Sequence, residues 1–387
     1  QGLVTIDTIQ GTNNLNIGDG DFVRFKNVGG MVELNDEKKD FMIFNSNYES
    51  FKIGDTSKFS EYTKGGIVYQ VKKPITKQYY PFCQRAMMFC DKYHPVSSSD
   101  GSKNGRTELL YMALSGIHDF YIKNNCTLPE VNNEKHYKEI AQNVKSMYET
   151  VKKNKIECYE NIQEFDEKIV ENVARWSSCN ISPVCCFFGG IIAQEIIKAS
   201  GKYIPIDQWL RFDFFETVEN LPENVNRNLL NCRYDDQIAI FGQELQEKLK
   251  DMNIFMVGAG ALGCEFIKNF GLMGIACKNG QITLTDNDNI SLSNLNRQFL
   301  FHKNDVGENS SKSFVAKRET LKMNKEINIK DYQLLVDEST RDIFDDEFFE
   351  KQDLLIGAVD NIVARKLIDK KSTFYKKIFI DSGTKDS

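Results

Sequence analysis

Short runs of alternating apolar and polar residues fill positions 1–80, and such alternation is typical of half-buried β-strands. Gly-Asp, Gly-Gly and Asn-Asp pairs separate the runs, as expected for tight turns. We therefore predict a small β-barrel-like domain over residues 1–80, which contain no cysteine. The predicted strands cover residues 21–26, 30–34, 41–45 and 67–72.

Residues 81–176 change to the period of an α-helix, with apolar side chains returning every three or four positions. Three such stripes predict a helical bundle and its core, and a serine- and glycine-rich stretch over residues 96–106 predicts a polar loop. The stripes consist of Leu110, Leu114, Ile117 and Tyr121, then Tyr137, Ile140, Val144, Met147 and Val151, and finally Ile162, Phe165, Ile169 and Val173.

An apolar helix is predicted within residues 177–226. Ser182 would cap its start, a proline in its first turn suits a helix, and Gly201 follows its expected end. Two adjacent glycines, Gly189 and Gly190, weaken such a helix but let a second backbone approach closely. We therefore expect tight packing of this helix against a neighbouring domain.

From residue 227 to residue 387, apolar strands alternate with helical stretches, which predicts a doubly wound, largely parallel sheet with its ligand at the carboxyl ends of the strands. The fold class is therefore multidomain α/β: a Rossmann-like domain preceded by a small β-barrel-like domain and a helical bundle. The expected strands are residues 254–257, 281–285, 327–334, 354–356 and 377–380.

Composition indicates a packed globular protein. Of 387 residues, 41% are hydrophobic and 27% charged, and only seven are proline. The net charge of -6 arises from interspersed acids and bases, without the basic stripe of a nucleic-acid-binding protein. The apolar stretch at residues 181–194 is shorter than the roughly 20 residues that span a bilayer, so we expect no membrane partner.

The ten cysteines are scattered, without Cys-x-x-Cys pairs or the spacing of metal ligands. This usage is typical of a reduced compartment, and we expect a cytoplasmic and nuclear protein.

A nucleotide-binding motif follows the strand at residues 254–257. Gly258, Gly260 and Gly263 have the spacing G-x-G-x-x-G, which makes a tight turn and directs a helix N-terminus toward a phosphate. The next strand ends at Asp286, where a carboxylate can bind ribose hydroxyls. These features alone fit a dinucleotide-dependent oxidoreductase equally well.

A polar cluster after the second strand favours ATP over a nicotinamide cofactor. Asn294, Arg297 and Gln298 follow one another closely there. A site for ATP phosphates needs such fixed donors, because they offset concentrated negative charge. The planar guanidinium of Arg297 pairs well with phosphate oxygens and stays charged.

At residues 253–301 the sequence closely resembles the adenylation domain of ubiquitin-activating enzymes (E1), and more loosely the bacterial adenylating enzymes of sulfur-carrier pathways. The resemblance extends over nearly the whole chain, in the order of the single-chain E1 type. It implies a first catalytic-cysteine half-domain at 1–80, a helical bundle at 81–176, the end of the inactive adenylation half at 177–226, and the active adenylation domain at 227–387. The similar segments are residues 18–23, 30–35, 55–60, 65–70, 189–195, 207–210, 231–242 and 358–361.

The resemblance also implies how adenosine is bound. Gly258, Gly260 and Ala261 would lie against adenosine and the phosphates, with only a small residue at position 261 leaving room. Asp286 would bind the ribose hydroxyls. Asp288 is a competitor for that role or a solvated carboxylate.

Further residues are assigned to the triphosphate by the same resemblance. Asn294 and Arg297 would contact it, and Gln298 would contact it or orient them. Asp360, after the strand at 354–356, would bind Mg²⁺, which takes carboxylate and phosphate oxygens. Asn361 would contact the nucleotide nearby, and a helix-capping role for Asp360 is the alternative.

Lys312 is the lysine that the resemblance places on the ATP phosphates. Residues 307–313 superficially look like a P-loop, but no glycine precedes Lys312, so we reject that motif. Because the loop before it is about two residues longer than usual in E1 enzymes, Lys303 and Lys317 are alternatives.

In this family the C-terminal carboxylate of ubiquitin attacks ATP, and a catalytic cysteine then takes the acyl group. The resemblance therefore implies ATP and Mg²⁺ as cofactors, ubiquitin and E2 ubiquitin-conjugating enzymes as partners, and Arg297, Lys312 and Asp360 as catalytic residues. No cysteine here matches the catalytic motif, and Cys264 is expected in the core. We expect a fragment of a larger enzyme that is inactive alone.

Two other functions stay open. A Rossmann-fold NAD-dependent oxidoreductase fits the glycine motif, although the Asn294–Gln298 cluster and the pair Asp360-Asn361 argue against it. A non-catalytic adenylation-like scaffold fits an inactive half-enzyme, although the nucleotide-binding residues are intact here.

Overall fold

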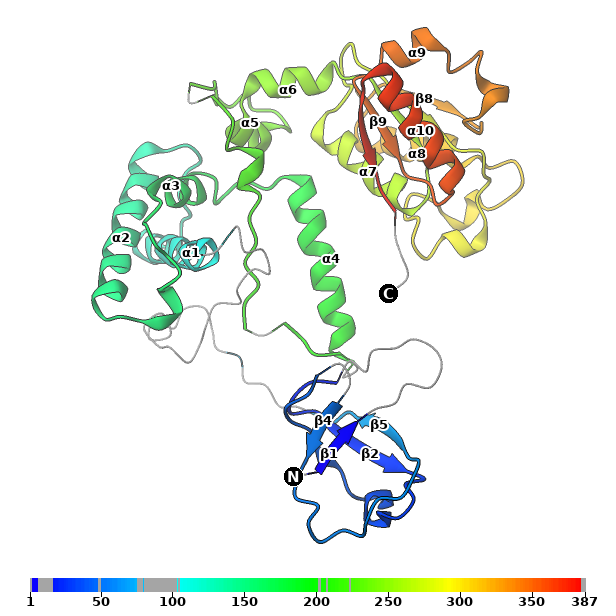
Figure 1. Ribbon diagram of the computed structural model, residues 1–387. Coiled ribbons are helices and arrows are strands. Elements are labelled where there is room, and N and C mark those ends of the chain that lie inside the picture. Colours follow the sequence, from blue (N-terminus) through cyan, green and yellow to red (C-terminus); the bar gives the residue numbers. More distant parts are fainter. Residues whose placement is uncertain are drawn as a thin grey trace. The chain divides into compact units, whose positions relative to one another are not determined.

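The computed structural model describes residues 2–5, 17–47, 50–74, 79, 103, 105–200, 203–206, 208–222 and 224–383. The chain forms two compact units, Gln1–Tyr79 and Tyr80–Ser387 (Figure 1). Most of the predicted loop at 96–106 lies outside the described residues, and so does Gly201. The predicted boundaries inside the second unit, at residues 176 and 226, stay predictions.

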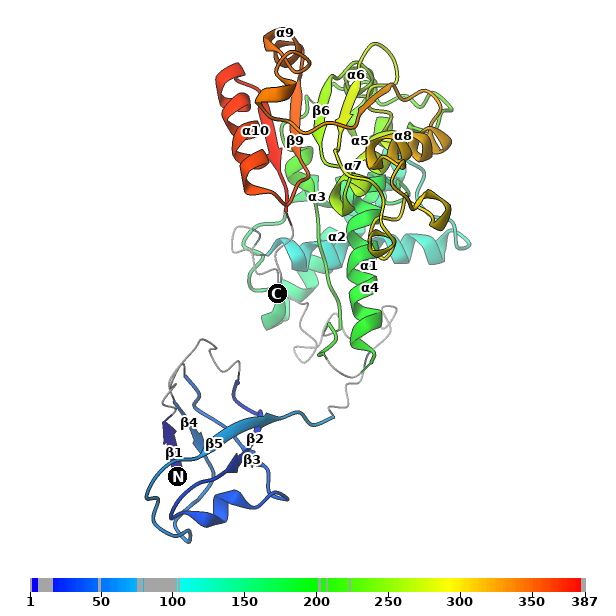
Figure 2. The same ribbon diagram turned by 90° about the vertical axis from the view of Figure 1, so that its right-hand side faces the viewer.

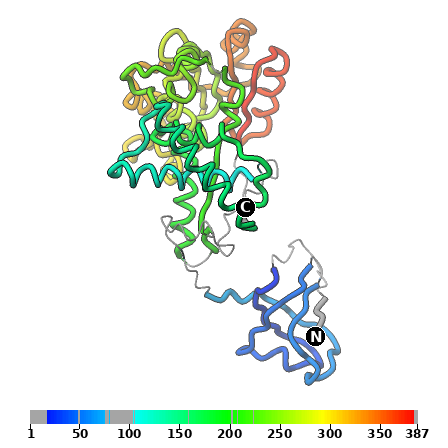
Figure 3. The backbone as a smooth tube through the Cα atoms, turned by 90° about the vertical axis from the view of Figure 1, so that its left-hand side faces the viewer, coloured from blue at the N-terminus to red at the C-terminus, as the bar shows by residue number. Residues whose placement is uncertain are grey.

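Antiparallel pairing organises the first unit into two small sheets, and Figure 3 draws the backbone of β2 to β5 in shades of blue. One sheet has the strand order β3-β2-β5, and the other pairs β1 with β4. In β2 and β4 every second side chain is buried, although β4 was not among the predicted strands. The strands are β1 Gly2–Thr5, β2 Phe22–Lys26, β3 Phe41–Met42, β4 Ser50–Ile53 and β5 Ile67–Val71.

The predicted strand over residues 30–34 is wrong, because Val32–Asn35 form a 3-10 helix. Gly30 turns the chain at a φ of 84°, a region that side chains disfavour. Asn35 then closes the loop by hydrogen bonding to both the backbone N–H and the C=O of Val28, each at 2.9 Å. Local bonding between side chain and backbone thus replaces strand pairing.

Three helices form the bundle at the start of the second unit (Figure 1). They are α1 Arg106–Lys123, α2 Glu134–Lys153 and α3 Glu167–Arg175. Asn133 and Asp166 cap α2 and α3, because their side-chain oxygens accept backbone N–H groups of the first turn. The core contains Leu109, Tyr111, Met112, Ala113, Ile117, Phe120, Tyr137, Ile140, Ala141, Val144, Tyr148, Val151, Tyr159, Ile162, Val170 and Ala174.

Two members of the first predicted stripe lie outside the core, since Leu114 is 42% exposed and Tyr121 is only half-buried beside it. Helix α1 is apolar on more than one side, and its contact with α2 is made through Gly116, which faces Val144. Leu114 lies instead beside an apolar groove of about 460 Å³, which Trp209 and Leu210 also line.

Helix α4, Ser182–Lys198, contradicts the expected tight packing. None of its residues is buried, and nothing lies within 4 Å of a Cβ added at Gly189 or Gly190. Ser182 does not cap the helix, because it lies within the first turn and its hydroxyl bonds to the side chain of Asn269. Within the described residues, neither α4 nor any other helix has the length and apolar character needed to cross a membrane.

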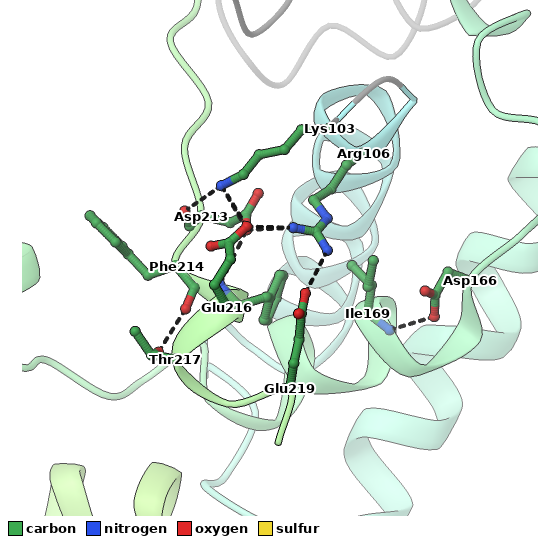
Figure 4. Close-up of polar contacts among 10 residues, drawn as sticks. Lys103, Arg106, Asp166, Ile169, Asp213, Phe214, Glu216, Thr217 and Glu219 are labelled. Carbon is green, nitrogen blue, oxygen red and sulfur yellow. Dashed lines mark hydrogen bonds and ion pairs between the residues drawn. The ribbon is translucent and has the colours of Figure 1, made fainter. Parts of the chain in front are cut away.

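A network of ion pairs joins residues 213–219, in the segment after α4, to the start of α1 (Figure 4). The carboxylate of Glu216 lies 2.9 Å from both Lys103 Nζ and Arg106 Nη1. Arg106 also reaches Glu219 at 3.1 Å and the buried Asp213 at 3.4 Å. The hydrogen bond from Lys103 lowers the pKa of Glu216, so the pairs hold at neutral pH.

Five parallel strands form the sheet of the remaining part, in the order β10-β9-β6-β7-β8. This is a doubly wound order, whose direction reverses between β6 and β9. The five predicted strands are confirmed, with ends that differ by at most two residues. The elements are α5 Asp235–Phe241, α6 Gln243–Lys250, β6 Ile254–Val257, α7 Ala261–Met273, β7 Ile282–Thr285, α8 Lys312–Met323, β8 Ile329–Tyr332, α9 Asp346–Glu350, β9 Leu354–Gly357, α10 Ile362–Tyr375 and β10 Ile378–Asp381.

Helices cover both faces of this sheet, with α7 and α8 on one face and α10 on the other (Figure 2). Alternate side chains of β6 therefore enter different cores. Ile254 and Met256 pack with α7 and α8, whereas Phe255 packs among the rings of Phe344 and Phe349. Burial on both faces explains why the central strand is apolar throughout.

We predict that Gly116→Ala destabilises the bundle by about 1–2 kcal/mol, because the new methyl group overpacks the core. A Cβ at this position would lie 2.4 Å from Cγ2 of Val144, a fully buried and stiff β-branched side chain. Native-state hydrogen exchange of α1 and α2 amides measures the change without requiring two-state unfolding of the whole chain.

Gly189→Ala provides the matched control, since it makes the same substitution inside a helix but in open space. It should slow exchange in α4, because alanine favours the helix by roughly 0.5–1 kcal/mol over glycine. Equal effects of the two substitutions on their own helices would contradict the proposed close contact at Gly116.

Candidate nucleotide site

A cavity of about 620 Å³ opens at the carboxyl ends of β6, β7 and β9, where the strand order reverses. Doubly wound sheets bind ligands at this point. The structure brings all nine predicted site residues together around the cavity, while their roles toward a ligand stay predictions. They are Gly258, Gly260, Ala261, Asp286, Asn294, Arg297, Lys312, Asp360 and Asn361.

The three glycines of the motif serve different purposes. Gly258 has a φ of 105°, and a Cβ there would lie 2.4 Å from the carbonyl oxygen of Ala358. A Cβ at Gly263 would lie 2.3 Å from the carbonyl oxygen of Gly258, so this glycine lets α7 pack on the turn. Gly260 has no such neighbour, since its nearest atom is Gln298 Nε2 at 3.8 Å. Its missing side chain therefore leaves room in the cavity.

Asp286 ties the glycine turn to the second strand. One carboxylate oxygen accepts the backbone N–H of Ala259 at 2.6 Å, and the other accepts that of Asp288 at 2.9 Å. Burial raises the pKa of Asp286 above its usual value, although these two N–H groups act in the opposite direction. The carboxylate keeps further lone pairs for ligand hydroxyls.

Asp288 has a definite partner, so it is not a merely solvated carboxylate. Its Oδ2 accepts the ammonium of Lys312 at 2.7 Å, and its carbonyl oxygen accepts the Lys312 backbone N–H at 3.1 Å. The Lys312 side chain is buried, whereas that of Asp288 is 57% exposed. The pair holds the lysine in the cavity wall at the first residue of α8.

The alternative lysines are placed elsewhere. Lys317 lies further along α8 and pairs with Asp331 at 2.7 Å. Lys303 is exposed and does not line the cavity. A loop rather than a strand precedes Lys312, and Ser311 caps α8. This arrangement agrees with the rejection of a P-loop.

The polar cluster after β7 contains a buried amide, that of Asn294, and an exposed guanidinium, that of Arg297. Asn294 is buried, and its Oδ1 accepts the Ser291 backbone N–H at 2.9 Å, which fixes its orientation. Arg297 is exposed and donates to the carbonyl oxygen of Ser293 and to Asn296 Oδ1, each at 3.1 Å. Because both acceptors are neutral, these contacts leave the guanidinium charge available to an anion.

Of the two roles considered for Asp360, the helix cap belongs to Asn361 instead. Asn361 is the residue that caps α10, since its Oδ1 accepts the Val363 N–H at 2.8 Å. Asp360 is exposed at the cavity and does not cap the helix. No cluster of three or more acidic, histidine or cysteine ligands occurs within the described ranges. A hard cation at Asp360 would therefore need phosphate oxygens and water as its other ligands, which is how Mg²⁺ usually binds.

Two parts of the cavity wall were missed by reading the sequence. Leu334 and Val336, just after β8, add an apolar patch that suits a flat aromatic base. On the opposite side, Arg365 of α10 forms a two-pronged ion pair with Asp381 at the end of β10, with its Nε 2.9 and 3.0 Å from the two carboxylate oxygens. The position of Arg365 one helical turn after Asn361 was the available signal.

Comparison with known families matches two regions of the chain. Residues 234–386 match the ThiF family, and residues 1–72 match the ubiquitin-activating enzyme E1 FCCH domain. The chain is also 38% identical over 376 residues to Ubiquitin-activating enzyme E1 1 of Triticum aestivum, covering 96% of this chain and 34% of that protein. The chain belongs to the ubiquitin-activating enzyme E1 family.

A second E1 relative is similar over nearly the same part of the chain. Ubiquitin-like modifier-activating enzyme 1 of Homo sapiens is 37% identical over 371 residues, which cover 94% of this chain and 34% of the human protein. The chain thus spans about a third of the length of the curated relatives it matches. Among solved structures, E. coli MccB with succinimide is 28% identical with a TM-score of 0.36, covering 42% of this chain and 47% of that one.

Membership of this family identifies the kind of domain that the doubly wound sheet and its helices form. Residues 234–386 form a Rossmann-like adenylation domain, so the alternative of an NAD-dependent oxidoreductase is set aside. The nine residues around the cavity therefore belong to an adenylation domain of the E1 family.

We predict that Asp286→Asn loosens the glycine turn and weakens nucleotide binding. An amide presents one oxygen where the carboxylate presented two, so either Ala259 or Asp288 loses the acceptor for its N–H. An unsatisfied buried N–H costs about 1–3 kcal/mol. Faster hydrogen exchange at Ala259, with weaker ATP binding in calorimetry, would show the effect.

Asp342→Asn removes an exposed carboxylate from the same half of the molecule and serves as the control. It should leave both measurements unchanged. Normal exchange at Ala259 in Asp286→Asn would contradict the role of the carboxylate in fixing the turn.

Proposed function

We propose that the complete protein activates ubiquitin with ATP, by forming an adenylate of its C-terminal carboxylate and passing the acyl group to a cysteine. The observation that carries this proposal is the cavity at the strand reversal, which joins an open glycine turn to three cationic side chains and an exposed carboxylate. Membership of the E1 family supports the same chemistry.

We assign the nucleotide an orientation from the chemistry of the wall. The adenine base is assigned to the apolar patch of Leu334 and Val336, and the ribose to the carboxylate of Asp286. The phosphates then follow the glycine turn toward Lys312 and Arg297. Backbone N–H groups at the start of α7 have no side-chain cap, so they are available to a phosphate.

Mg²⁺ is proposed as the second cofactor, with Asp360 as its protein ligand. The exposed carboxylate at the end of a strand, beside the phosphate path, fits a cation that takes one or two carboxylates and otherwise phosphate oxygens and water. When bound, the ion would neutralise charge on the phosphates.

The side chains then act by position and charge. The ubiquitin carboxylate is the nucleophile, forming a bond to the α-phosphorus while the bond to pyrophosphate breaks, so no protein group needs to form a covalent bond in this step. Lys312 and Arg297 stabilise the negative charge that gathers on the phosphate oxygens. Asp288 keeps the lysine in place before the nucleotide arrives.

We assign the acceptor cysteine of the second step to a part of the protein outside these residues. Cys264 is fully buried beside the glycine turn, and burial raises the pKa of its thiol to about 12. Burial raises the pKa of Cys179 to about 12 as well. Neither thiol has the lowered pKa of a nucleophile.

E2 ubiquitin-conjugating enzymes are proposed as the partners that receive ubiquitin from the complete protein. We also propose a cytoplasmic and nuclear location, which the free thiols of the cysteines that the structure describes support. A non-catalytic scaffold is the second candidate, and an absence of ATP binding would favour it.

In the complete enzyme, Asp360→Ala is predicted to reduce ubiquitin-dependent exchange of pyrophosphate into ATP by at least about 100-fold. The loss of a Mg²⁺ ligand removes charge balance worth several kcal/mol at the phosphates. The matched control is Asp369→Ala, which removes an exposed carboxylate from α10. Exchange within twofold of wild type for Asp360→Ala, at equal magnesium, would refute the assignment.

The present chain alone is predicted not to form a ubiquitin thioester. Incubation with ATP, Mg²⁺ and ubiquitin, followed by a non-reducing gel, should show no thiol-sensitive adduct. An ATP-dependent adduct would mean that one of its ten cysteines is a nucleophile.

A further inference from the structure

Two arginines lie close to the same tryptophan at the junction between the helical bundle and α5. Arg175 is the last residue of α3, and Arg227 lies in the segment before α5, where its Nε donates to the carbonyl oxygen of Ile240 at 3.1 Å. Their guanidinium carbons lie 6.0 and 5.9 Å from the ring centroid of Trp176. Both arginines are half-buried, so two positive charges share a partly dehydrated place in the fold.

The charge of this arginine pair is not balanced by carboxylates. No acidic side chain among the described residues lies within 4.0 Å of either guanidinium group. The pKa of Glu134 is lowered chiefly by a hydrogen bond from Lys138, at 2.5 Å, and least by the charge of Arg175. Burial lowers the pKa of Arg227, and repulsion from Arg175 lowers it further. By contrast, Arg106 of the same unit contacts three carboxylates (Figure 4).

Buried polar atoms beside the arginine pair lack hydrogen-bond partners. Arg175 Nε and the indole Nε1 of Trp176 are donors without an acceptor. Asn132 donates its backbone N–H to the carbonyl oxygen of Arg175 at 3.3 Å, and its side-chain oxygen is an acceptor without a donor. Native proteins satisfy most such groups, because an unpaired one costs free energy. The two unpaired donors and the two unbalanced cations indicate a missing partner that accepts hydrogen bonds and carries negative charge.

We propose that Arg175 and Arg227 bind a phosphate ion at this junction, with the indole N–H of Trp176 as a further donor. Guanidinium groups suit this ligand because their planar fork matches phosphate oxygens and they stay charged. At neutral pH a phosphate ion also bears hydrogen, which the unpaired oxygen of Asn132 can accept. None of these four residues lines the nucleotide cavity, so the inference is independent of the proposed function.

A bound phosphate ion would strengthen the contact between the bundle and α5. Asn132 Nδ2 already joins the two, by donating to the carbonyl oxygen of Ala239 at 3.3 Å. Across the same junction the two arginines repel each other. An anion between them replaces this repulsion with two attractive contacts. Phosphate should therefore stabilise the junction in proportion to its concentration.

Fluorescence of Trp176 provides the readout, because the chain has only two tryptophans. In a Trp209→Phe background, orthophosphate exchanged for chloride at constant ionic strength should change this fluorescence, with half-saturation on the order of 1 mM. At ten times that concentration, hydrogen exchange of amides at the end of α3 and in α5 should slow roughly tenfold, because the ligand opposes openings that break its site.

Substitutions at Arg227 test the site directly. Arg227→Gln keeps a polar tip but removes the charge, so it should raise the half-saturating phosphate concentration tenfold or more. Arg227→Lys keeps the charge without the planar fork and should have an intermediate effect. The matched control is Arg341→Gln, which removes an exposed arginine from the same unit and should leave the phosphate response unchanged. Circular dichroism checks that each variant is folded, and Arg227→Lys decides if Arg227→Gln is not.

Three outcomes would overturn the inference. The first is the absence of a fluorescence change when phosphate replaces chloride. The second is an unchanged phosphate response in the folded Arg227 variants. The third is loss of the response in Lys312→Ala, since the ion would then lie in the nucleotide cavity. A response that persists in Lys312→Ala supports the junction site, whether or not the chain binds ATP, so the two proposals fail separately.

Discussion

The carboxylate of Asp286 is the constraint on which the cavity depends. It accepts the N–H of Ala259 at 2.6 Å in the glycine turn and the N–H of Asp288 at 2.9 Å in the loop after β7. The same loop then places Asp288 beside Lys312. One half-buried carboxylate, whose pKa is raised by desolvation, thereby fixes the glycine turn and the loop that positions the buried Lys312. Its remaining lone pairs face the ribose position proposed for ATP.

Two of the three cationic side chains in the cavity wall form ion pairs with carboxylates. Lys312 is neutralised by Asp288, and Arg365 by Asp381, while Arg297 contacts neutral oxygens. A buried charge without a partner costs much free energy, so the Asp288 contact balances the charge of the buried lysine until a phosphate competes for it. The exposed side of the pair is the carboxylate, which water can solvate once the lysine turns to a ligand.

Whether a feature could be predicted from the sequence depends on how far apart in the chain the interacting residues lie. The strands around residues 254–257 and the glycine turn are encoded by neighbouring residues, and both were predicted. The 3-10 helix at Val32–Asn35 was not, because it depends on Asn35 reaching back to Val28. Leu114 was misplaced because α1 is apolar on several sides, and only its partner helix decides which side is buried. The orphaned oxygen of Gln298 was invisible in the sequence, since it depends on which residues surround it.

Neutral and charged side chains lie at different depths in the cavity wall, and this has a physical cause. Gln298 and Asn294 are neutral and buried, and Lys312 is buried only with its counter-ion. Arg297 and Asp360, whose side chains are ionic, lie exposed. Removing an unpaired charge from water costs far more than removing an amide, so charged groups can serve the ligand only from the rim or in pairs. A triphosphate fits this gradient, since its charge increases away from the nucleoside. In the orientation proposed for the nucleotide, the outer phosphates would lie nearest to the exposed side chains of Arg297 and Asp360.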